Sequence, residues 1–224
     1  LISNIEILQK FLDKKKIKLK IQSIKNISEI DKIEKNNFNV FDIKAKNLIE
    51  NTYKSLKKSY ELAKDNLIGG IITLPINKSI IINYFDKKFR GQTEYFQKLD
   101  KKKYSNMIFF HKKILITTLT NHIKLIDVTN KIKDKKEIYN KIKTLILTLK
   151  KDFNICNPKI AISGLNPHAG ENGDIGKEEI NFLIPVINKI KKLNVEIEGP
   201  ISGDSVFNKI NIKKYDCFIC CYHD

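Results

Sequence analysis

Three of the four histidines follow strand-like segments of the chain. His122 comes after the apolar run KILITTLT, His168 lies in the loop after KIAISGL, and His223 comes after CFICCY. In α/β proteins, ligand sites gather beyond the carboxyl ends of the strands, so these imidazoles are expected at one edge of a sheet. Three imidazoles can bind one divalent metal ion and leave coordination positions open for a substrate. The spacing alone fits a shared metal site and, equally, unrelated loop or core histidines; His111, between two strand-like runs, is interpreted as structural.

A glycine-rich loop, GLNPHAGENGDIG, surrounds His168. Its glycines let the backbone turn tightly and approach a ligand closely. It is not a Walker A loop, because Glu178 follows Lys177 where that motif needs Ser or Thr. It also lacks the G-x-G-x-x-G pattern. From the glycine spacing alone, a phosphate-binding loop and an ordinary strand-to-helix loop are equally compatible with the sequence.

The four cysteines do not indicate a metal site. Cys217 and Cys220 form a C-x-x-C within CFICCY, but residues three apart in a strand face opposite sides of the sheet. No second C-x-x-C is present. We interpret Cys217, Cys220, Cys221 and Cys156 as buried, reduced thiols of a cytosolic protein.

The composition indicates a basic protein with enough apolar residues for a real core. The chain has 224 residues, of which 42% are hydrophobic, and a formal net charge of +17. The lysines are spread along the whole chain and no nucleic-acid-binding signature is visible, so we interpret the charge as compositional. A positive field would still attract a phosphorylated substrate. Neither a long apolar run nor a secretory signal is present, which predicts a cytoplasmic protein without a membrane span.

Strand-like and helix-like patterns alternate along the chain, which predicts an α/β fold. One expected strand, residues 67–75, ends at Pro75, and Asn77 is expected to cap a short helix after it. The other expected strands cover residues 18–24, 107–113, 113–120, 159–165, 195–202 and 217–222, and the longer expected helices cover residues 1–16, 47–65, 137–153 and 176–194.

Several sequence blocks together resemble the 4-hydroxythreonine-4-phosphate dehydrogenase family. The blocks SGLNPHAGENGDIGKEE, EGPISGDSVF and CCYHD carry the likeness, and LPINKSIIINYF, RGQTEYF and TNHIKLIDV match in order. The resemblance implies an isocitrate/isopropylmalate-dehydrogenase-like α/β fold, with a mixed central sheet flanked by helices. It implies that residues 1–224 form a partial catalytic region of two interleaved lobes. It also implies a homodimer with active sites at the interface.

The same resemblance assigns site residues. It implies that His122, His168 and His223 bind a divalent metal such as zinc, magnesium or cobalt, with both subunits contributing to the site. It places substrate contacts at Gln92 and Thr93, in a G-Q-T-E motif where the family has G-H-T-E. Glutamine can donate and accept hydrogen bonds but cannot carry charge. Substrate affinity or specificity is therefore expected to differ at this position.

The implied reaction is NAD-linked (or NADP-linked) oxidation of 4-phosphooxy-L-threonine, followed by decarboxylation, in pyridoxal phosphate biosynthesis. We interpret Asp204 as support for the site or as a proton carrier, or alternatively as the cap of the short helix SVFNKI. Lys78 is interpreted as a contact for the substrate phosphate or carboxylate, or alternatively as a solvated lysine at a helix start.

The ends of the chain depart from the family pattern. The opening motif G-D-P-x-G-I-G-P-E is absent, and so is the segment after YHD where much of the cofactor contact would lie. We therefore expect this chain alone to be inactive, and to expose apolar surface near residues 217–222 or cover it with a partner. Three alternatives remain open: a sister dehydrogenase for another phosphorylated four-carbon hydroxy acid, a non-catalytic fragment or pseudoenzyme, and a basic nucleic-acid binder.

Overall fold

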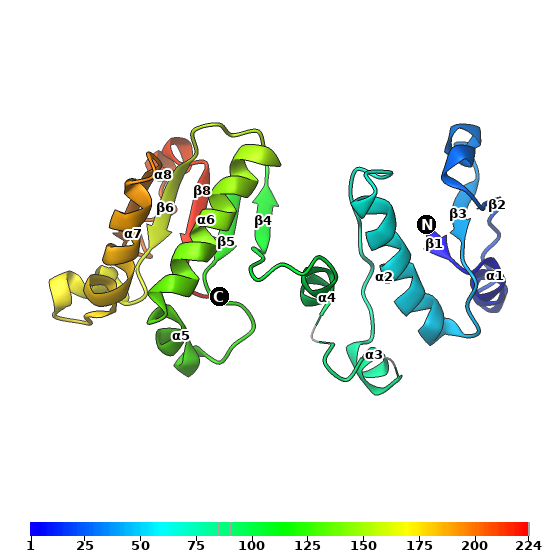
Figure 1. Ribbon diagram of the computed structural model, residues 1–224, viewed down its shortest axis with the longest axis horizontal. Helices are drawn as coiled ribbons and strands as arrows, with labels where there is room; N and C mark the ends of the chain where they lie inside the picture. The colour runs from blue at the N-terminus through cyan, green and yellow to red at the C-terminus, as the bar shows by residue number, and fades with distance from the viewer. Residues whose placement is uncertain (85, 90, 224) are drawn as a thin grey trace. The chain divides into compact units, whose positions relative to one another are not determined.

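The computed structural model describes residues 1–84, 86–89 and 91–223. The quoted blocks LPINKSIIINYF, RGQTEYF and CCYHD each include one residue outside these ranges. The chain divides into two compact units that are consecutive in sequence, Leu1–Lys102 and Lys103–Asp224. Figure 1 labels most of the helices and strands of each unit. The predicted alternation of helices and strands is confirmed in both units.

The first unit contains a three-stranded parallel sheet with the order β1-β3-β2. Two of its helices begin at asparagine caps, because Asn4 Oδ1 accepts from Ile7 N and Asn47 Oδ1 accepts from Glu50 N. The elements are β1 (Ile2–Ser3), α1 (Ile5–Lys14), β2 (Ile21–Ile24), η1 (Ile27–Lys32), β3 (Phe38–Asp42), α2 (Leu48–Lys64), α3 (Lys78–Tyr84) and α4 (Gln92–Leu99).

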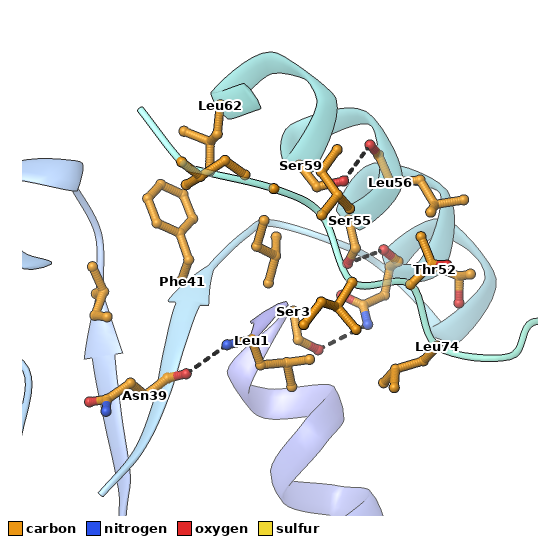
Figure 2. A pocket seen from close by; sticks show the side chains of 18 of the residues that line it. Leu1, Ser3, Asn39, Phe41, Thr52, Ser55, Leu56, Ser59, Leu62 and Leu74 are labelled. Atoms are coloured by element: carbon orange, nitrogen blue, oxygen red, sulfur yellow. Dashed lines mark hydrogen bonds between the residues drawn. The ribbon is translucent and has the colours of Figure 1, made fainter. Parts of the chain in front are cut away.

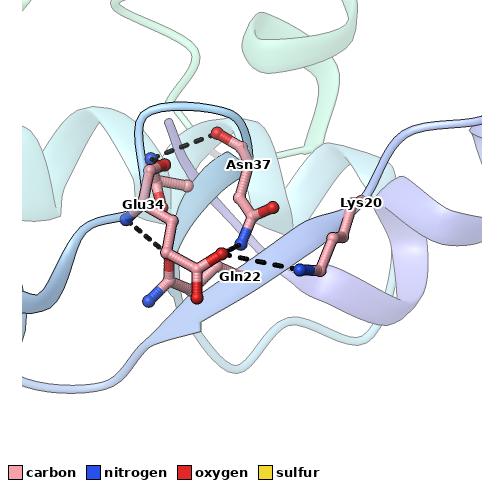
Figure 3. A network of polar contacts seen from close by, with 5 residues as sticks. Lys20, Gln22, Glu34 and Asn37 are labelled. Carbon is pink, nitrogen blue, oxygen red and sulfur yellow. Dashed lines mark hydrogen bonds and ion pairs between the residues drawn. The ribbon is translucent and has the colours of Figure 1, made fainter.

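A polar network links β2 to the segment that leads into β3 (Figure 3). Glu34 N donates to Gln22 Oε1 at 3.0 Å, and the Glu34 carboxylate accepts from Asn37 Nδ2 at 2.7 Å. Lys20 Nζ lies 3.5 Å from the same carboxylate. These hydrogen bonds are exposed to solvent, so the network fixes the path of the chain more than it stabilises the fold.

The predicted strand at residues 67–75 is wrong. This segment has no regular secondary structure, and Ile72 and Leu74 are 95% and 64% exposed. A strand needs a neighbour to satisfy its backbone groups, and an apolar run alone does not supply one. The helix after it does form, and Asn77 Oδ1 accepts a long hydrogen bond from Ile80 N at 3.4 Å, as expected for a cap.

Residues 70–76, α2 and the small sheet line a cavity of about 610 Å³ (Figure 2). Its lining is largely aliphatic. Three of its hydroxyls already bond the backbone of α2: Thr52 Oγ1 donates to Leu48 O at 2.9 Å, Ser55 Oγ to Asn51 O at 2.7 Å, and Ser59 Oγ to Leu56 O at 2.8 Å. The cavity therefore presents mainly hydrocarbon and little that could act on a substrate.

The second unit is built on a five-stranded sheet with the order β4-β5-β8-β6-β7. β4 is antiparallel to β5, whereas the other pairs are parallel, so the predicted mixed sheet is confirmed. The elements are β4 (Ile108–His111), β5 (Ile114–Thr118), α5 (Leu125–Ile132), α6 (Lys135–Lys151), β6 (Lys159–Ser163), η2 (Pro167–Gly173), η3 (Glu179–Leu183), α7 (Ile184–Lys191), β7 (Glu196–Ile201), α8 (Lys209–Lys214) and β8 (Cys217–Cys220).

The expectation of one continuous α-helix over residues 176–194 is wrong. Glu179–Leu183 forms a π-helical turn before α7 begins at Ile184. Pro185 has no backbone N–H to donate, so the regular pattern of helix hydrogen bonds cannot pass through it unchanged. Single π-helical turns are rare and occur frequently at functional sites.

The expected exposure of residues 217–222 is also wrong. β8 lies between β5 and β6, and Cys217, Phe218 and Ile219 are at most 1% exposed. Successive residues of a strand face opposite sides of the sheet. Accordingly, Cys217 and Ile219 pack in the main core with α6 and α7, whereas Phe218 packs with Val206 on the other face.

The prediction of buried thiols holds for most but not all of the cysteines. Cys217 and Cys221 are buried, and burial raises the pKa of each thiol to about 12. Cys220 is half-buried and its pKa is also raised by burial. Cys156 is exposed, which corrects the expectation for that residue.

The described helices include none that is both long and apolar enough to cross a bilayer.

Candidate active site

Parallel pairing of β5 and β8 brings His122 and His223 together. The pairing continues past the strand ends, where Thr120 N and Thr120 Oγ1 both donate to the Cys221 carbonyl oxygen, at 3.2 and 2.8 Å. His122 and His223 each lie two residues further along the chain. Their ring centroids are 5.6 Å apart. The expectation that these two imidazoles meet at one edge of the sheet is confirmed.

Side chains from β4 and α6 support this edge. Phe109 makes an edge-to-face contact with the His223 ring, with centroids 5.5 Å apart. On α6, Lys141 Nζ donates to the carbonyl oxygen of Leu119, at the end of β5. Burial lowers the pKa of Lys141. His122 adopts a left-handed backbone conformation with φ of 52°, so the chain turns sharply at that residue.

His168 follows β6, the other neighbour of β8 in the sheet. Residues 168–172 all have positive φ, between 44° and 81°. L-residues other than glycine pay roughly 1–2 kcal/mol each for this conformation. Only Gly170 among the five escapes that cost. Such a strained run persists only where the surrounding structure fixes it.

Glu179 holds much of this strained run in place, and its role was not predicted from the sequence. Its side chain is 1% exposed. The carboxylate accepts from Leu165 N at 2.8 Å, from Asn166 N at 2.7 Å and from Asn166 Nδ2 at 2.9 Å. Burial alone would raise the pKa of this carboxyl, but hydrogen bonds, chiefly those from Asn166, bring the pKa below its ordinary value.

A signal for Glu179 was present in the sequence. It shares the helical spacing of the buried residues Leu183, Val186 and Ile190, so it occupies an apolar face. A glutamate on such a face needs a specific partner. Acidic residues at a helix start also suit the helix dipole, so their position there does not by itself indicate a buried partner.

The three predicted metal ligands are not assembled into one cluster. The described residues contain no group of three or more His, Cys, Asp or Glu side chains that could hold a metal ion. His122 and His223 nevertheless suit a shared ion. With zinc–nitrogen bonds of about 2.0–2.1 Å and tetrahedral geometry, two bound imidazoles have ring centres about 5 Å apart. All three histidines are exposed and accessible to an incoming ion.

The predicted substrate residues belong to the first unit. Lys78 and Thr93 are exposed, and each lies at the start of a short helix. The two helix starts are close, because a Cβ added to Gly91 would lie 3.7 Å from Lys78 Nζ. Gln92 Nε2 donates to the Leu74 carbonyl oxygen at 2.9 Å. This bond ties the irregular segment before α3 to the first turn of α4.

Asp204 lies on an exposed turn after β7. Its alternative interpretation as a helix cap is wrong, because the helix here begins at Lys209 and its cap is Asn208. Asn208 Oδ1 accepts from Ile210 N and Asn211 N, at 2.9 and 2.8 Å. A role for Asp204 in proton transfer or site support stays a prediction.

Comparisons with known proteins identify relatives over the whole chain. The family model described as "Pyridoxal phosphate biosynthetic protein PdxA" matches residues 1–224. Several relatives carry the name 4-hydroxythreonine-4-phosphate dehydrogenase. The one from Sulfurihydrogenibium sp. is 32% identical over 216 residues, which cover 93% of this chain and 65% of the relative. The one from Aquifex aeolicus is 39% identical over 161 residues, which cover 70% of this chain and 48% of the relative. The chain thus spans about half to two thirds of their length.

Solved structures agree with this family. The crystal structure of a 4-hydroxythreonine-4-phosphate dehydrogenase from Burkholderia phymatum is 27% identical, with a TM-score of 0.84, covering 100% of this chain and 70% of that one. The enzyme of the same name from Klebsiella pneumoniae is 24% identical, with a TM-score of 0.90, covering 100% of this chain and 71% of that one. The second likeness shows the shared fold alone.

Proposed function

The chain belongs to the PdxA family of pyridoxal phosphate biosynthesis, and we propose that it provides the metal-binding region of a 4-hydroxythreonine-4-phosphate dehydrogenase. The observation that carries the proposal is the pair His122 and His223, whose ring centroids lie 5.6 Å apart at the carboxyl ends of adjacent parallel strands. In that position they can bind an ion that a substrate also reaches. We further propose a cytoplasmic homodimer that does not bind nucleic acid.

The proposed reaction oxidises the secondary alcohol of 4-phosphooxy-L-threonine and passes its hydride to NAD or NADP. The resulting β-keto acid then loses carbon dioxide. A bound divalent ion such as zinc, magnesium or cobalt would supply Lewis acidity to the alcohol and to the later ketone. The nicotinamide cofactor accepts the hydride, so the protein contributes position and electrostatic field.

The residues have distinct proposed roles. His122 and His223 hold the ion, and His168 is the third ligand. Lys78 contributes positive charge toward the phosphate or carboxylate of the substrate. Gln92 and Thr93 contribute neutral hydrogen bonds. Asp204, exposed on its turn, is the proposed proton carrier.

The test is an assay of the longest polypeptide that the reading frame encodes, with 4-phosphooxy-L-threonine, NAD and added divalent metal. NADH formation is followed by absorbance. His122→Ala and His223→Ala should each lower the rate by about 100-fold or more, as expected for loss of a ligand to a catalytic metal. His111→Ala is the matched control, because His111 is an exposed histidine on β4 that the proposal gives no role. No NADH formation with any metal, or equal loss in the control, would refute the proposal.

A second candidate is a sister dehydrogenase for another phosphorylated four-carbon hydroxy acid. Gln92 favours it, because this amide replaces a side chain that can carry charge and is already bonded to Leu74 O. Comparing kcat/KM for several such substrates, with and without Gln92→His, separates the two candidates. If Gln92→His raises the rate with 4-phosphooxy-L-threonine but the unaltered protein prefers another acid, the second candidate is correct.

A further inference from the structure

We propose that Glu179 is the positioning residue for His168, holding the loop in place on both sides of the imidazole. This inference rests on the proposed function, because the position of His168 matters only if the loop serves the metal site. Glu179 itself is not proposed to touch the ion or the substrate.

On the side that precedes His168, the carboxylate is fixed by three donors. Leu165 N and Asn166 N donate to one oxygen at 2.8 and 2.7 Å, and Asn166 Nδ2 donates to the other at 2.9 Å. The glutamate is almost fully buried, so water does not compete for these bonds. Hydrogen bonds to a charged acceptor in such a place are among the stronger ones in proteins.

On the side that follows His168, the same carboxylate lies against Gly170. A Cβ added to Gly170 would lie 2.7 Å from Glu179 Oε2 and 2.6 Å from the Gly176 carbonyl oxygen. Only Pro167, His168 and Ala169 lie between the two fixed points, and Ala169 N is bonded to Asn166 O at 3.1 Å. The backbone that carries the imidazole therefore has little freedom to shift while Glu179 is in place.

The conformation that Glu179 holds is one that the chain would not adopt unaided. His168, Ala169, Glu171 and Asn172 all occupy the left-handed region. Without an anchor, these residues would relax toward the ordinary regions of negative φ and carry the imidazole with them. The anchor comes from the π-helical turn, which presents Glu179 toward the loop.

The neighbouring Glu178 provides a matched comparison. Its carboxylate accepts from the same Asn166 Nδ2 at 2.9 Å. Unlike Glu179, it is half-buried and has no hydrogen bond to the loop backbone among the described residues. Replacing either glutamate with glutamine removes one negative charge next to Asn166. Only in Glu179→Gln does an NH2 group have to face another donor inside the buried site, because one carboxylate oxygen accepts from two backbone N–H groups and the other accepts from Asn166 Nδ2.

The experiment measures cobalt binding by the whole protein, using the visible absorption bands of Co²⁺ as a spectroscopic report of its ligands. Glu179→Gln should weaken Co²⁺ binding by about 10- to 100-fold, the usual effect of losing a partner that orients a ligand, and should alter the bands. Glu178→Gln should change the affinity by less than about two-fold, because no loop backbone bond is lost. Val186→Ala, in the core on α7, controls for simple destabilisation, and should lower the melting temperature without changing the bands.

A second measurement does not depend on any metal. Amide hydrogen exchange at Leu165 and Asn166 should accelerate in Glu179→Gln and remain as in the unaltered protein in Glu178→Gln. The inference is overturned if Glu179→Gln binds Co²⁺ with unchanged affinity and bands, or if Val186→Ala weakens binding equally. If the unaltered protein binds no Co²⁺, or His168→Ala binds it normally, the proposed metal site itself fails.

Discussion

Gly170→Ala should destabilise the second unit more than Gly173→Ala does. Both glycines lie in the loop after β6 and have positive φ. Alanine at φ of 81° costs about 1 kcal/mol relative to glycine. Its Cβ would also lie 2.6 Å from the Gly176 carbonyl oxygen and 2.7 Å from Glu179 Oε2. Making room displaces a buried carboxylate, and loosening a hydrogen bond to a charged group costs about 1.5–3 kcal/mol. The expected total is about 3 kcal/mol.

Two other glycines serve as comparisons for this estimated loss of stability. Gly173 also has positive φ, at 106°, but an added Cβ would meet only flexible side chains, Ile180 Cδ1 at 3.3 Å and Lys177 Cγ at 3.6 Å. Gly173→Ala should therefore cost about 1 kcal/mol, from the backbone alone. Gly203 has no atom within 4 Å of an added Cβ. Gly203→Ala should change stability by no more than about 0.5 kcal/mol.

The assay is urea unfolding followed by far-UV circular dichroism, with hydrogen exchange of peptides from β6 and β8 to report on the second unit specifically. The order of destabilisation should be Gly170→Ala, then Gly173→Ala, then Gly203→Ala. If Gly170→Ala costs no more than Gly173→Ala, the contact between the carboxylate and the loop does not constrain the structure as described. The loop would then not be held rigidly by Glu179.

Three further outcomes are expected. Burial lowers the pKa of Lys141 below its ordinary value of 10.5, so between the folded and unfolded pKa values the folded state binds fewer protons than the unfolded state, and this residue's contribution to stability rises with pH. In urea unfolding across that pH window, any stability advantage of Lys141→Met should therefore shrink as pH rises. A stability difference that stays constant with pH would contradict the reasoning. A thiol reagent at mildly alkaline pH should label the exposed Cys156 well before Cys217 and Cys221, whose pKa values burial raises to about 12. A fast phase of thiol labelling that survives Cys156→Ser would refute this. Because the lysines are spread along the chain, binding to random duplex DNA should be weak, and a nanomolar affinity with steep salt dependence in a titration would revive the nucleic-acid alternative.

The strands of the second unit were predictable because their signals are local. Apolar runs such as KIAISGL and CFICCY are short and end at loops, and these features alone place them in a buried sheet. The run at residues 67–75 has the same local character but no strand partner among the described residues. The error arose because strand pairing depends on residues far away in sequence, which local pattern does not reveal. The same limit explains why the position of β8 inside its sheet was not anticipated.

In the candidate site, too, the features set by local sequence were predictable and those set by tertiary contacts were not. His122 and His223 were predicted to meet because each follows a strand, and parallel strands end at one edge of a sheet. The left-handed run at residues 168–172 could not be predicted, because only one of its five residues is a glycine. Gln92 was recognised as a departure from the family motif, yet its bond to Leu74 O depends on tertiary structure.

The two halves of the proposed metal site differ in how firmly the fold holds them. The His168 backbone is fixed by a buried carboxylate and adopts a strained conformation that persists only because of its surroundings. His122 and His223 are exposed side chains, and Phe109 supports one of them by a ring contact. An incoming ion would therefore have to order the pair, at a cost in side-chain entropy, whereas the loop that carries the third imidazole is already ordered. It follows that damage to the loop should lower metal affinity through lost preorganisation, and damage to the pair through lost ligands. The two kinds of variant should accordingly differ in hydrogen exchange of the metal-free protein, even where their metal affinities are equally reduced.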